Sequence, residues 1–454
     1  MIHVGRGSVV VEYPSQELMS GLSRFRHDAN GQGEYEELYT LSERHHSLVT
    51  MPGFASRIKR LCPDEGIKDE RVPMPVPDVA KALEGVPEVW HGVVKDALAA
   101  GGGVVAIPEM FGIAGLASAI ARALPRDALA ERGTPLTVVA ARDRDTTRRI
   151  AFEMRRILPD RDVGIGDCDS EDILVAQYGV CLEDYPMQSV GILIGDDVAC
   201  EDPKVFVKRA RHVSVFRNAA RWGVYETACG GGPDELDLAA EGLFGPLSAS
   251  ATYDDAVRAG VASPVTVCWL EAPRPKVNWG SAPLKTLASI AMGKEFAEVV
   301  ADIVGRTSGD TGCIVCSDMQ TQKALAGRVG RNGPCVVINR RSAAKDVKIM
   351  FDDMAIGNIP RAMVTWDRFP PATSHGVMVS ATCGGREVAG VRFPWRGSGK
   401  SGKVYIVDFN HSWDVHNGRP GVLARNDAAR RRRYSELGFS QLSVEDVEHL
   451  PFVG

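Results

Sequence analysis

The stretch that decides the fold runs from Ala106 to Ala121 and reads AIPEMFGIAGLASAIA. Its first residues close the apolar run GVVAIP, which predicts a buried strand over residues 103–108. Apolar side chains then recur at spacings of three and four from Ile113 to Leu124, which predicts an amphipathic helix that packs one face on a sheet. A glycine-containing loop between a strand and a helix is a common place for nucleotide phosphates to bind. The stretch contains no lysine, so the sequence raises the question of whether a nucleotide binds here.

The same alternation of strand and helix patterns extends over most of the chain. Short apolar runs bounded by turn residues alternate with helix-period segments from about residue 86 to residue 273, which is the pattern of a parallel α/β sheet. One of these helices, in DTTRRIAFEMRRIL, is predicted to begin at an N-cap formed by Asp145. The alternation resumes after EAPRPKVNWGSAP, whose proline and glycine content predicts a linker.

The predicted fold class is α/β, with two consecutive parallel-sheet domains behind a small α+β N-terminal domain. The first 72 residues lack the regular strand–helix alternation of the rest of the chain, because mixed strand patterns surround a helix pattern near GFASRIKRL. The expected divisions are the small N-terminal domain (residues 1–72), the first α/β domain (78–272), a linker (273–284), the second α/β domain (285–425), and a basic C-terminal helix with its tail (426–454).

The composition predicts a soluble globular protein. The chain has 454 residues, of which 44% are hydrophobic and 24% charged, enough to build the cores of two or three domains. No apolar run approaches the roughly 18 residues that span a bilayer, and the N-terminus lacks a signal-like segment. Ten scattered cysteines fit a reducing compartment. We expect a cytoplasmic protein with no membrane partner, in which Cys313 and Cys316 pack in a core and bind no metal.

The charge of the chain limits how it can contact nucleic acid. The net charge is −5, so such a contact has to come from a local basic patch. The densest patch is the run from Arg430 to Arg433 near the C-terminus. A solvated helix face and a phosphate-binding surface explain this run equally well.

Two long segments carry a resemblance to a known family. One is DELDLAAEGLFGPLSASATYDDAVRAGVASPVTVCWLEAP, in which a Leu-Phe-Gly-Pro run precedes a Tyr-x-x-Ala-x-x-x-Gly helix and a Pro-Val strand. The other is VYIVDFNHSWDVHNGRPGVLARNDAARRRRYSELGF, with its closing strand and Arg/Tyr helix. Both resemble superfamily 2 DNA helicases of the phage, XPB and type III restriction kind, and the resemblance covers nearly the whole chain. It implies two tandem RecA-like domains whose strand-end loops face a common nucleic-acid track.

The resemblance identifies the opening stretch as a degenerate Walker A loop. Pro108 matches the proline that begins this loop in the family, and Gly112 matches the glycine before its lysine. Ile113 stands in the place of the lysine, and Ala114 in the place of the serine or threonine. In the family the lysine reaches the β and γ phosphates and the hydroxyl holds Mg²⁺. Because Glu109 would also repel phosphate, neither ATP nor Mg²⁺ is expected to bind unless another cation replaces the lysine.

Other ATPase motifs of the family are altered as well. Asp196 keeps the Mg²⁺-coordinating position of motif II and is a possible metal ligand, but Asp197 replaces the glutamate that orients water. These two residues are remnants, and no catalytic residue is predicted. In motif VI, Val391 and Pro394 occupy the arginine positions. A Gly-Lys-Ser sequence at residues 399–401 precedes a strand instead of following one, so we do not expect it to bind nucleotide.

Candidate nucleic-acid contacts follow from the family's strand-end loops and from the nearby cations. They are Arg142, Gln177, Tyr178, Gly179, Thr365, Arg392, Arg396, Lys400, Arg430, Arg431, Arg432 and Arg433. Contacts from such loops hold phosphates without reading bases.

Three functions remain open. The first is a pseudo-helicase without ATP hydrolysis that binds DNA or scaffolds a replication or recombination complex, with an active helicase or other replication proteins as partners. The second is an ATP-dependent DNA translocase in which Lys400, Arg392 or a partner chain supplies the missing cation. The third is a structural interaction module that binds no nucleic acid. The changes are spread over several motifs while the packing patterns remain readable, which favours the first.

Overall fold

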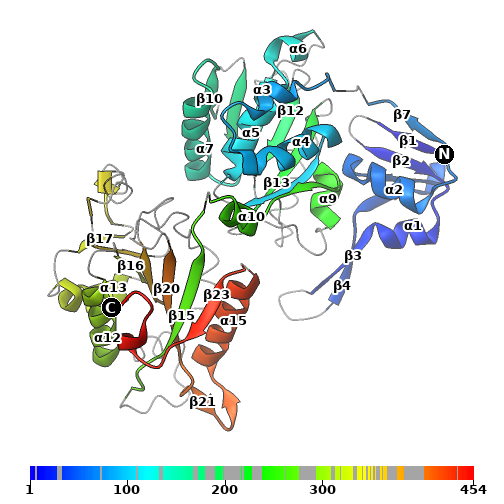
Figure 1. Cartoon of the computed structure of the whole chain (residues 1–454). Helices are drawn as coiled ribbons and strands as arrows, with labels where there is room; N and C mark the ends of the chain where they lie inside the picture. The colour runs from blue at the N-terminus through cyan, green and yellow to red at the C-terminus, as the bar shows by residue number, and fades with distance from the viewer. Residues whose placement is uncertain are drawn as a thin grey trace. The chain divides into compact units, whose positions relative to one another are not determined.

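The computed structural model of the chain divides into two compact units, Met1–Thr252 and Tyr253–Gly454, and each is described by itself. Figure 1 shows the elements of both units. The structure describes residues 1–5, 8–27, 33–71, 74–108, 111–131, 136–166, 172–178, 190–196, 198, 216, 219–227, 238–260, 262–275, 293–307, 312–316, 319–330, 335–339, 341–343, 346–347, 349–350, 353, 358–359, 361–365, 376–382, 403–436 and 438–453.

The first unit begins with the small α+β domain that the sequence predicts. Its sheet has the order β5-β6-β2-β1-β7, in which β7 runs parallel to β1 and the other pairs are antiparallel. Its elements are β1 (Ile2–Val4), β2 (Val9–Glu12), α1 (Gln16–Gly21), the hairpin of β3 (Ser23–His27) and β4 (Gly33–Glu37), β5 (Tyr39–Ser42), β6 (Ser47–Thr50), the 3₁₀ turn η2 (Pro52–Phe54), α2 (Ala55–Leu61) and β7 (Ile67–Asp69).

The larger part of the first unit is an all-parallel sheet of seven strands in the order β10-β11-β9-β12-β13-β8-β14. Its strands are β8 (Gly103–Pro108), β9 (Leu136–Ala141), β10 (Val163–Ile165), β11 (Ile173–Gln177), β12 (Val190–Gly195), β13 (Ala220–Thr227) and β14 (Leu247–Ser250). Its helices are α3 (Val79–Leu83), α4 (His91–Ala100), α5 (Gly112–Ala123), α6 (Arg126–Ala130), α7 (Arg144–Ile157) and α9 (Leu238–Phe244). The sequence missed β10, β13 and β14 as strands.

The two faces of this sheet have different covers. On one face, the Trp222 indole of β13 donates a hydrogen bond to the Ala97 carbonyl of α4, 3.0 Å away. On the other face, a side chain at Gly223 would collide with Phe244 of α9. The N-terminal domain packs against α9, where Arg57 of α2 forms an ion pair with the buried Glu241 at 2.5 Å. The small domain therefore forms part of the cover of the sheet.

The second unit contains another all-parallel sheet of seven strands, in the order β17-β18-β16-β19-β20-β15-β23. Its strands are β15 (Val265–Glu271), β16 (Gly312–Cys316), β17 (Val336–Ile338), β18 (Arg361–Thr365), β19 (Val377–Ala381), β20 (Val404–Asn410) and β23 (Ser440–Ser443), and a small ladder joins β21 (Val415–His416) to β22 (Arg419–Pro420). Its helices are α10 (Tyr253–Arg258), α12 (Lys294–Arg306), α13 (Met319–Val329) and α15 (Val422–Glu436). The two parallel sheets confirm the predicted fold class.

The predicted domain boundaries need two corrections. Strand β15 was expected to close the first α/β domain at residue 272, but it lies inside the second sheet, between β20 and β23. The predicted C-terminal segment 426–454 is not separate either, because β23 is an edge strand of the same sheet. An apolar run such as VTVCWL shows that a strand is buried, but it carries no information about which sheet the strand joins.

The N-cap of α7 is also corrected. The helix begins at Arg144, and the Asp143 carboxylate accepts a hydrogen bond from the Thr146 backbone N–H at 2.7 Å. Asp145, the predicted N-cap, lies within the first turn. Both aspartates fit the sequence signal for a helix start, so the error is two residues.

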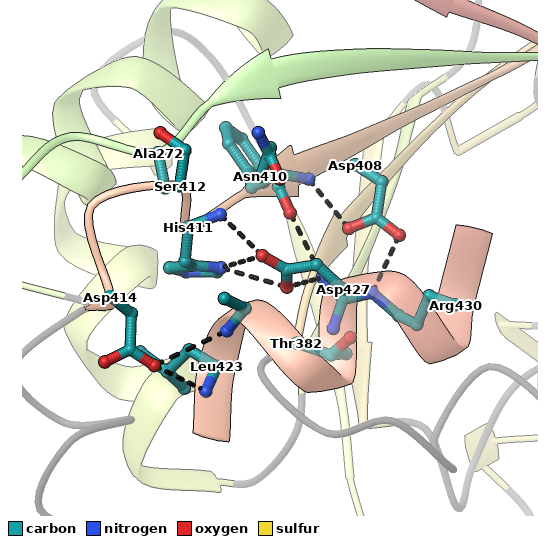
Figure 2. A network of polar contacts seen from close by, with 12 residues as sticks. Ala272, Thr382, Asp408, Asn410, His411, Ser412, Asp414, Leu423, Asp427 and Arg430 are labelled. Carbon is teal, nitrogen blue, oxygen red and sulfur yellow. Dashed lines mark hydrogen bonds and ion pairs between the residues drawn. The ribbon is translucent and has the colours of Figure 1, made fainter. Parts of the chain in front are cut away.

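A buried polar network fastens α15 to the end of β20 (Figure 2). The Arg430 guanidinium donates to the Asp408 carboxylate at 3.0 Å and to the Asp427 carboxylate at 2.9 Å. The Tyr434 hydroxyl donates to the same Asp408 oxygen at 2.9 Å, and Asp427 also contacts the ring nitrogen Nδ1 of His411 at 3.1 Å. Burial by itself would lower the pKa of Arg430, but the two carboxylates raise it above its usual value.

Spacing along α15 explains why these residues meet. Asp427, Arg430 and Tyr434 are separated by three and four positions and therefore lie on one face of the helix. That face is buried, and Arg430 has no exposed surface. At the start of the same helix, the Asp414 carboxylate accepts a hydrogen bond from the Leu423 N–H at 2.7 Å. The Arg/Tyr pattern in this part of the sequence is thus a structural anchor.

The corrected boundary predicts how the second unit behaves as a fragment. A fragment of residues 253–454 is expected to fold cooperatively, because it keeps β15 between β20 and β23. A fragment of residues 273–454 is expected to fail, because β23 loses its partner and β20 loses a neighbour. Far-ultraviolet circular dichroism during heating checks both. Equal cooperative unfolding of the two fragments would show that residue 273 is the better boundary.

The buried network predicts unequal effects of two neighbouring arginines on stability. Arg430→Met leaves Asp408 and Asp427 buried without their cation, and such a loss costs about 3–5 kcal/mol. Arg432→Met removes an exposed arginine two residues away and is expected to change stability by about 0.5 kcal/mol or less. Urea denaturation of the full chain measures both changes. Similar effects of the two variants would contradict the anchoring role.

Candidate nucleotide and nucleic-acid sites

The junction between β8 and α5 has the strand–loop–helix form that the sequence predicts. Strand β8 ends at Pro108, whose carbonyl accepts a hydrogen bond from the Phe111 N–H at 3.0 Å, and α5 begins at Gly112. Ile113 is 0% exposed and Ala114 is 1% exposed. The two side chains predicted to stand at the Walker A lysine and hydroxyl positions are therefore part of the apolar core of this unit.

An aromatic pair lies at the start of α5. The Phe111 ring stacks on Trp90, with 5.3 Å between ring centroids and an interplanar angle of 14°. A Cβ atom on Gly115, one turn into the helix, would lie 2.9 Å from the Phe111 ring, so the ring sits tightly against the helix. A buried isoleucine, a buried alanine and a stacked phenylalanine offer neither a cation for phosphates nor an oxygen for Mg²⁺. The described residues of this junction do not fit ATP with Mg²⁺.

The carboxyl ends of β9, β11 and β12 bring three predicted residues together. The Arg142 backbone N–H lies 3.4 Å from a carboxylate oxygen of Asp196, and the Gln177 side-chain amide donates to the Arg142 carbonyl at 3.5 Å. Asp196 itself is buried, and its N–H donates to the Ala140 carbonyl at 2.8 Å. Arg142 is exposed and lies 3.6 Å from the Asp143 carboxylate. This cluster places one exposed guanidinium and one amide at the edge of the sheet.

Two predicted nucleic-acid contacts prove to be interior residues. Tyr178 is 3% exposed, and its hydroxyl lies where a side chain on Gly195 would be. Thr365, at the end of β18, is 2% exposed. Their positions after apolar strands match the family's loops, but the local packing turns both side chains inward. Neither side chain is available to a nucleic acid in this structure.

The run of four arginines is not a single basic patch. Arg430 is buried in the network of Figure 2, so its predicted role as a nucleic-acid contact is wrong. The Arg431 guanidinium stacks over the Trp269 ring at 4.0 Å. Arg432 is exposed, and the side chain of Arg433 lies outside the described residues. A helix distributes four consecutive side chains around its axis, so a run in sequence does not form a patch in space.

Five further predicted positions, Gly179, Asp197, Arg392, Arg396 and Lys400, lie outside the described residues. Cys313 and Cys316 of β16 are buried, as expected, and burial raises the pKa of the Cys313 thiol. Across the described ranges, no group of three histidine, cysteine, aspartate or glutamate side chains is arranged to hold a metal ion. In the same ranges, no helix is both long and apolar enough to span a bilayer.

The structure also reveals cations that the sequence analysis passed over. Arg144 and Arg148 are exposed on α7, one turn apart, next to Arg142. Phe152, a further turn along, is 61% exposed, which is unusual for a phenylalanine. The signal was present in the sequence, because these residues lie opposite the buried Ile150 on the same helix.

Comparisons with known proteins agree with this architecture. No family model matches the chain, and no curated protein matches its sequence. Among solved structures, S. cerevisiae Dbp5 bound to RNA and ADP BeF3 has a TM-score of 0.50 at 11% identity, over 82% of this chain and 94% of that chain. T4 UvsW has a TM-score of 0.40 at 12% identity, over 98% and 99%. A DEAD box protein from Methanococcus jannaschii has a TM-score of 0.45 at 10% identity, over 82% and 98%.

These likenesses concern the fold, since all three identities are low. The Dbp5 match covers both parallel-sheet units, and the sheets themselves have the strand orders described above. The chain has two tandem domains of RecA-like fold preceded by a small α+β domain, an architecture that it shares with Dbp5.

Proposed function

We propose that this chain uses the superfamily 2 helicase fold without ATP hydrolysis, as a pseudo-helicase that binds DNA or scaffolds a replication or recombination complex. The observation that carries the proposal is the start of α5, where Ile113 and Ala114 are buried at the positions of the family's lysine and hydroxyl residue. Phosphoryl transfer depends on positioning and on charge stabilisation. A site that lacks both groups loses a phosphate cation and a Mg²⁺ ligand together.

The aromatic pair supports the same conclusion. The stacked rings of Trp90 and Phe111 extend the apolar core up to the first residue of α5. Anions bind at helix N-termini through free backbone N–H groups, which the oxygens of the anion must be able to reach. An apolar ring against the helix makes this end a poor place for a triphosphate, so we infer that the loop serves packing.

The nucleic-acid part of the proposal rests on the exposed arginines at the carboxyl edge of the first sheet. Arg142, Arg144 and Arg148 follow the end of β9 and line the beginning of α7. Exposed guanidinium groups bind backbone phosphates without identifying bases. We therefore assign the proposed phosphate contact to this group, the α7 arginines with Arg142, in place of the run at residues 430–433.

The first prediction of this proposal is that the purified chain releases no phosphate from ATP, with or without DNA. An Asp196→Ala variant is the matched control, because it removes the carboxylate at the Mg²⁺-coordinating position of motif II. Phosphate release is measured with single-stranded DNA, duplex DNA and RNA present in turn. Release by the unaltered chain above the level of this variant would contradict the proposal.

The double variant Ile113→Lys with Ala114→Thr sharpens this test. It restores the two family residues at the start of α5, but it leaves Val391 and Pro394 in the motif VI positions. We expect no recovery of turnover, because the arginines of motif VI complete the ATP site in the family. Recovery of DNA-stimulated hydrolysis would mean that the loop alone accounts for the inactivity.

The second prediction concerns DNA binding. A triple variant with Arg142, Arg144 and Arg148 changed to alanine is expected to bind DNA more weakly at low salt. Each phosphate contact contributes roughly one unit to the slope of log affinity against log salt, so the slope should fall by up to about three. Fluorescence anisotropy with a labelled oligonucleotide at two salt concentrations measures the change.

A second triple variant controls for net charge. Arg60, Arg258 and Arg419 are exposed arginines on α2, α10 and β22, and their change to alanine removes the same three charges. This variant is expected to keep most of the affinity and slope. Equal weakening of DNA binding by both variants would contradict a localised contact. If the unaltered chain does not bind DNA at low salt, scaffolding remains as the proposed role.

A further inference from the structure

A cavity of about 780 Å³ lies within the first unit, at the amino ends of β8 and β13. Its walls come from the N-terminal domain on one side, through η2, α2 and the segment after β7. On the other side they come from residues 100–103, 219–221 and 243–248. The degenerate Walker A loop follows the carboxyl end of β8, so this cavity lies at the opposite edge of the sheet. Its volume is in the range of small-molecule sites.

Arg221 lines the cavity, and its buried guanidinium has no carboxylate partner among the described residues. Arg221 of β13 is 8% exposed, and its Nη2 donates to the Phe216 carbonyl at 3.2 Å. Burial lowers the pKa of Arg221 to about 10, and no carboxylate in the described part of the chain acts against that effect. The group is therefore still charged at neutral pH, and most of its five N–H donors are not used by this single bond.

The contrast with other arginines makes this environment unusual. Arg430, the other buried arginine of the described residues, has two carboxylates. Arg161 is mostly buried and pairs with Asp172. A buried guanidinium without such a partner costs several kcal/mol in desolvation, which no carboxylate of the described residues offsets at Arg221. An anion that enters the cavity would supply the missing charge.

Among the residues that line the cavity, Arg221 is the better candidate for binding an anion. The glycines of the wall leave room for a ligand. Arg71, the other arginine at the cavity, is already paired with Asp69, whose pKa is lowered by this contact. Gly102 and Gly103 have φ values of 152° and 116°, which side chains rarely adopt. A Cβ atom on them would lie 2.9 Å from the Arg221 carbonyl and 2.6 Å from the Pro246 carbonyl. At Gly102 and Gly103 the wall of the cavity therefore consists of backbone atoms, and these two residues place no side chain there.

We propose that this cavity binds a small molecule through a phosphate or carboxylate group held by the Arg221 guanidinium. The planar fork of N–H donors matches two oxygens of either group, and a buried contact of this kind is strong because water does not compete with it. The site is independent of the proposed DNA contact, which uses exposed arginines at the other edge of the sheet.

The test is a thermal-shift titration of the full chain with inorganic phosphate and, separately, with acetate, at constant ionic strength set by chloride. We expect a saturable rise in melting temperature with at least one of the two anions. Arg221→Met should weaken that response about tenfold or more, since a charge-assisted bidentate contact is lost. Arg71→Gln is the matched control, because it alters a paired arginine at the same cavity, and it should keep the response.

The melting temperature without added anion separates a ligand site from a structural role. Arg221→Met removes an uncompensated buried charge, so the variant is expected to be at least as stable as the unaltered chain. A variant that is less stable and still responds fully to the anion would overturn the proposal. A chain that shows no saturable response to either anion would overturn it as well.

Ser56→Trp keeps the proposal testable if Arg221→Met does not fold. Ser56 is an exposed residue of the cavity wall on α2, so a tryptophan there narrows the cavity and leaves the guanidinium in place. This variant should also lose the anion response. If either variant weakens binding of a short duplex DNA and leaves the response to phosphate and acetate intact, the cavity belongs to the nucleic-acid surface and the small-molecule proposal fails.

Discussion

A parallel sheet has to be covered on both faces, because the helices that connect its strands lie there. This constraint governs both units of the chain. Strands β8, β9 and β12 are buried along their whole length, and so is β19 in the second sheet. Polar side chains are consequently concentrated at the ends of the strands: the amino edge of each sheet, where the strands begin, and the carboxyl edge, where they end. The candidate contact at Arg142 lies at a carboxyl edge, and the cavity at Arg221 lies at an amino edge.

Packing at the start of α5 connects the fold to the proposed absence of ATP hydrolysis. Full burial of an isoleucine side chain contributes about 1.5–3 kcal/mol, and Ile113 is completely buried. A lysine at the same position would need an anion or water to hold its charge. The apolar residue therefore stabilises the first unit without a nucleotide. Under the proposed function, the start of α5 serves the core through Ile113 and Ala114.

The described arginines suit four physical roles, and burial with partner choice distinguishes them. Arg430 is buried with two carboxylates and anchors α15, while Arg431 stacks on Trp269. Arg144 and Arg148 are exposed and suit contacts that depend on salt. Among the described residues the buried Arg221 has a carbonyl as its partner, which suits a ligand better than a structural bond. Residue type alone predicts none of these differences.

The sequence by itself determined the fold class and most of the strands. Runs such as GVVAIP and LTVVAA are apolar because both faces of a parallel strand are buried, so their pattern is readable without a structure. The apolar identity of Ile113 and Ala114 at the start of the helix was equally readable, because it depends on residue type alone. Only the tertiary structure decided which sheet β15 joins, since a strand's partner is set by contacts distant in sequence. Only the tertiary structure distinguishes the buried Arg430 from the exposed Arg432 and places Arg221 at a cavity. Burial depends on what packs around a side chain, which the sequence does not show.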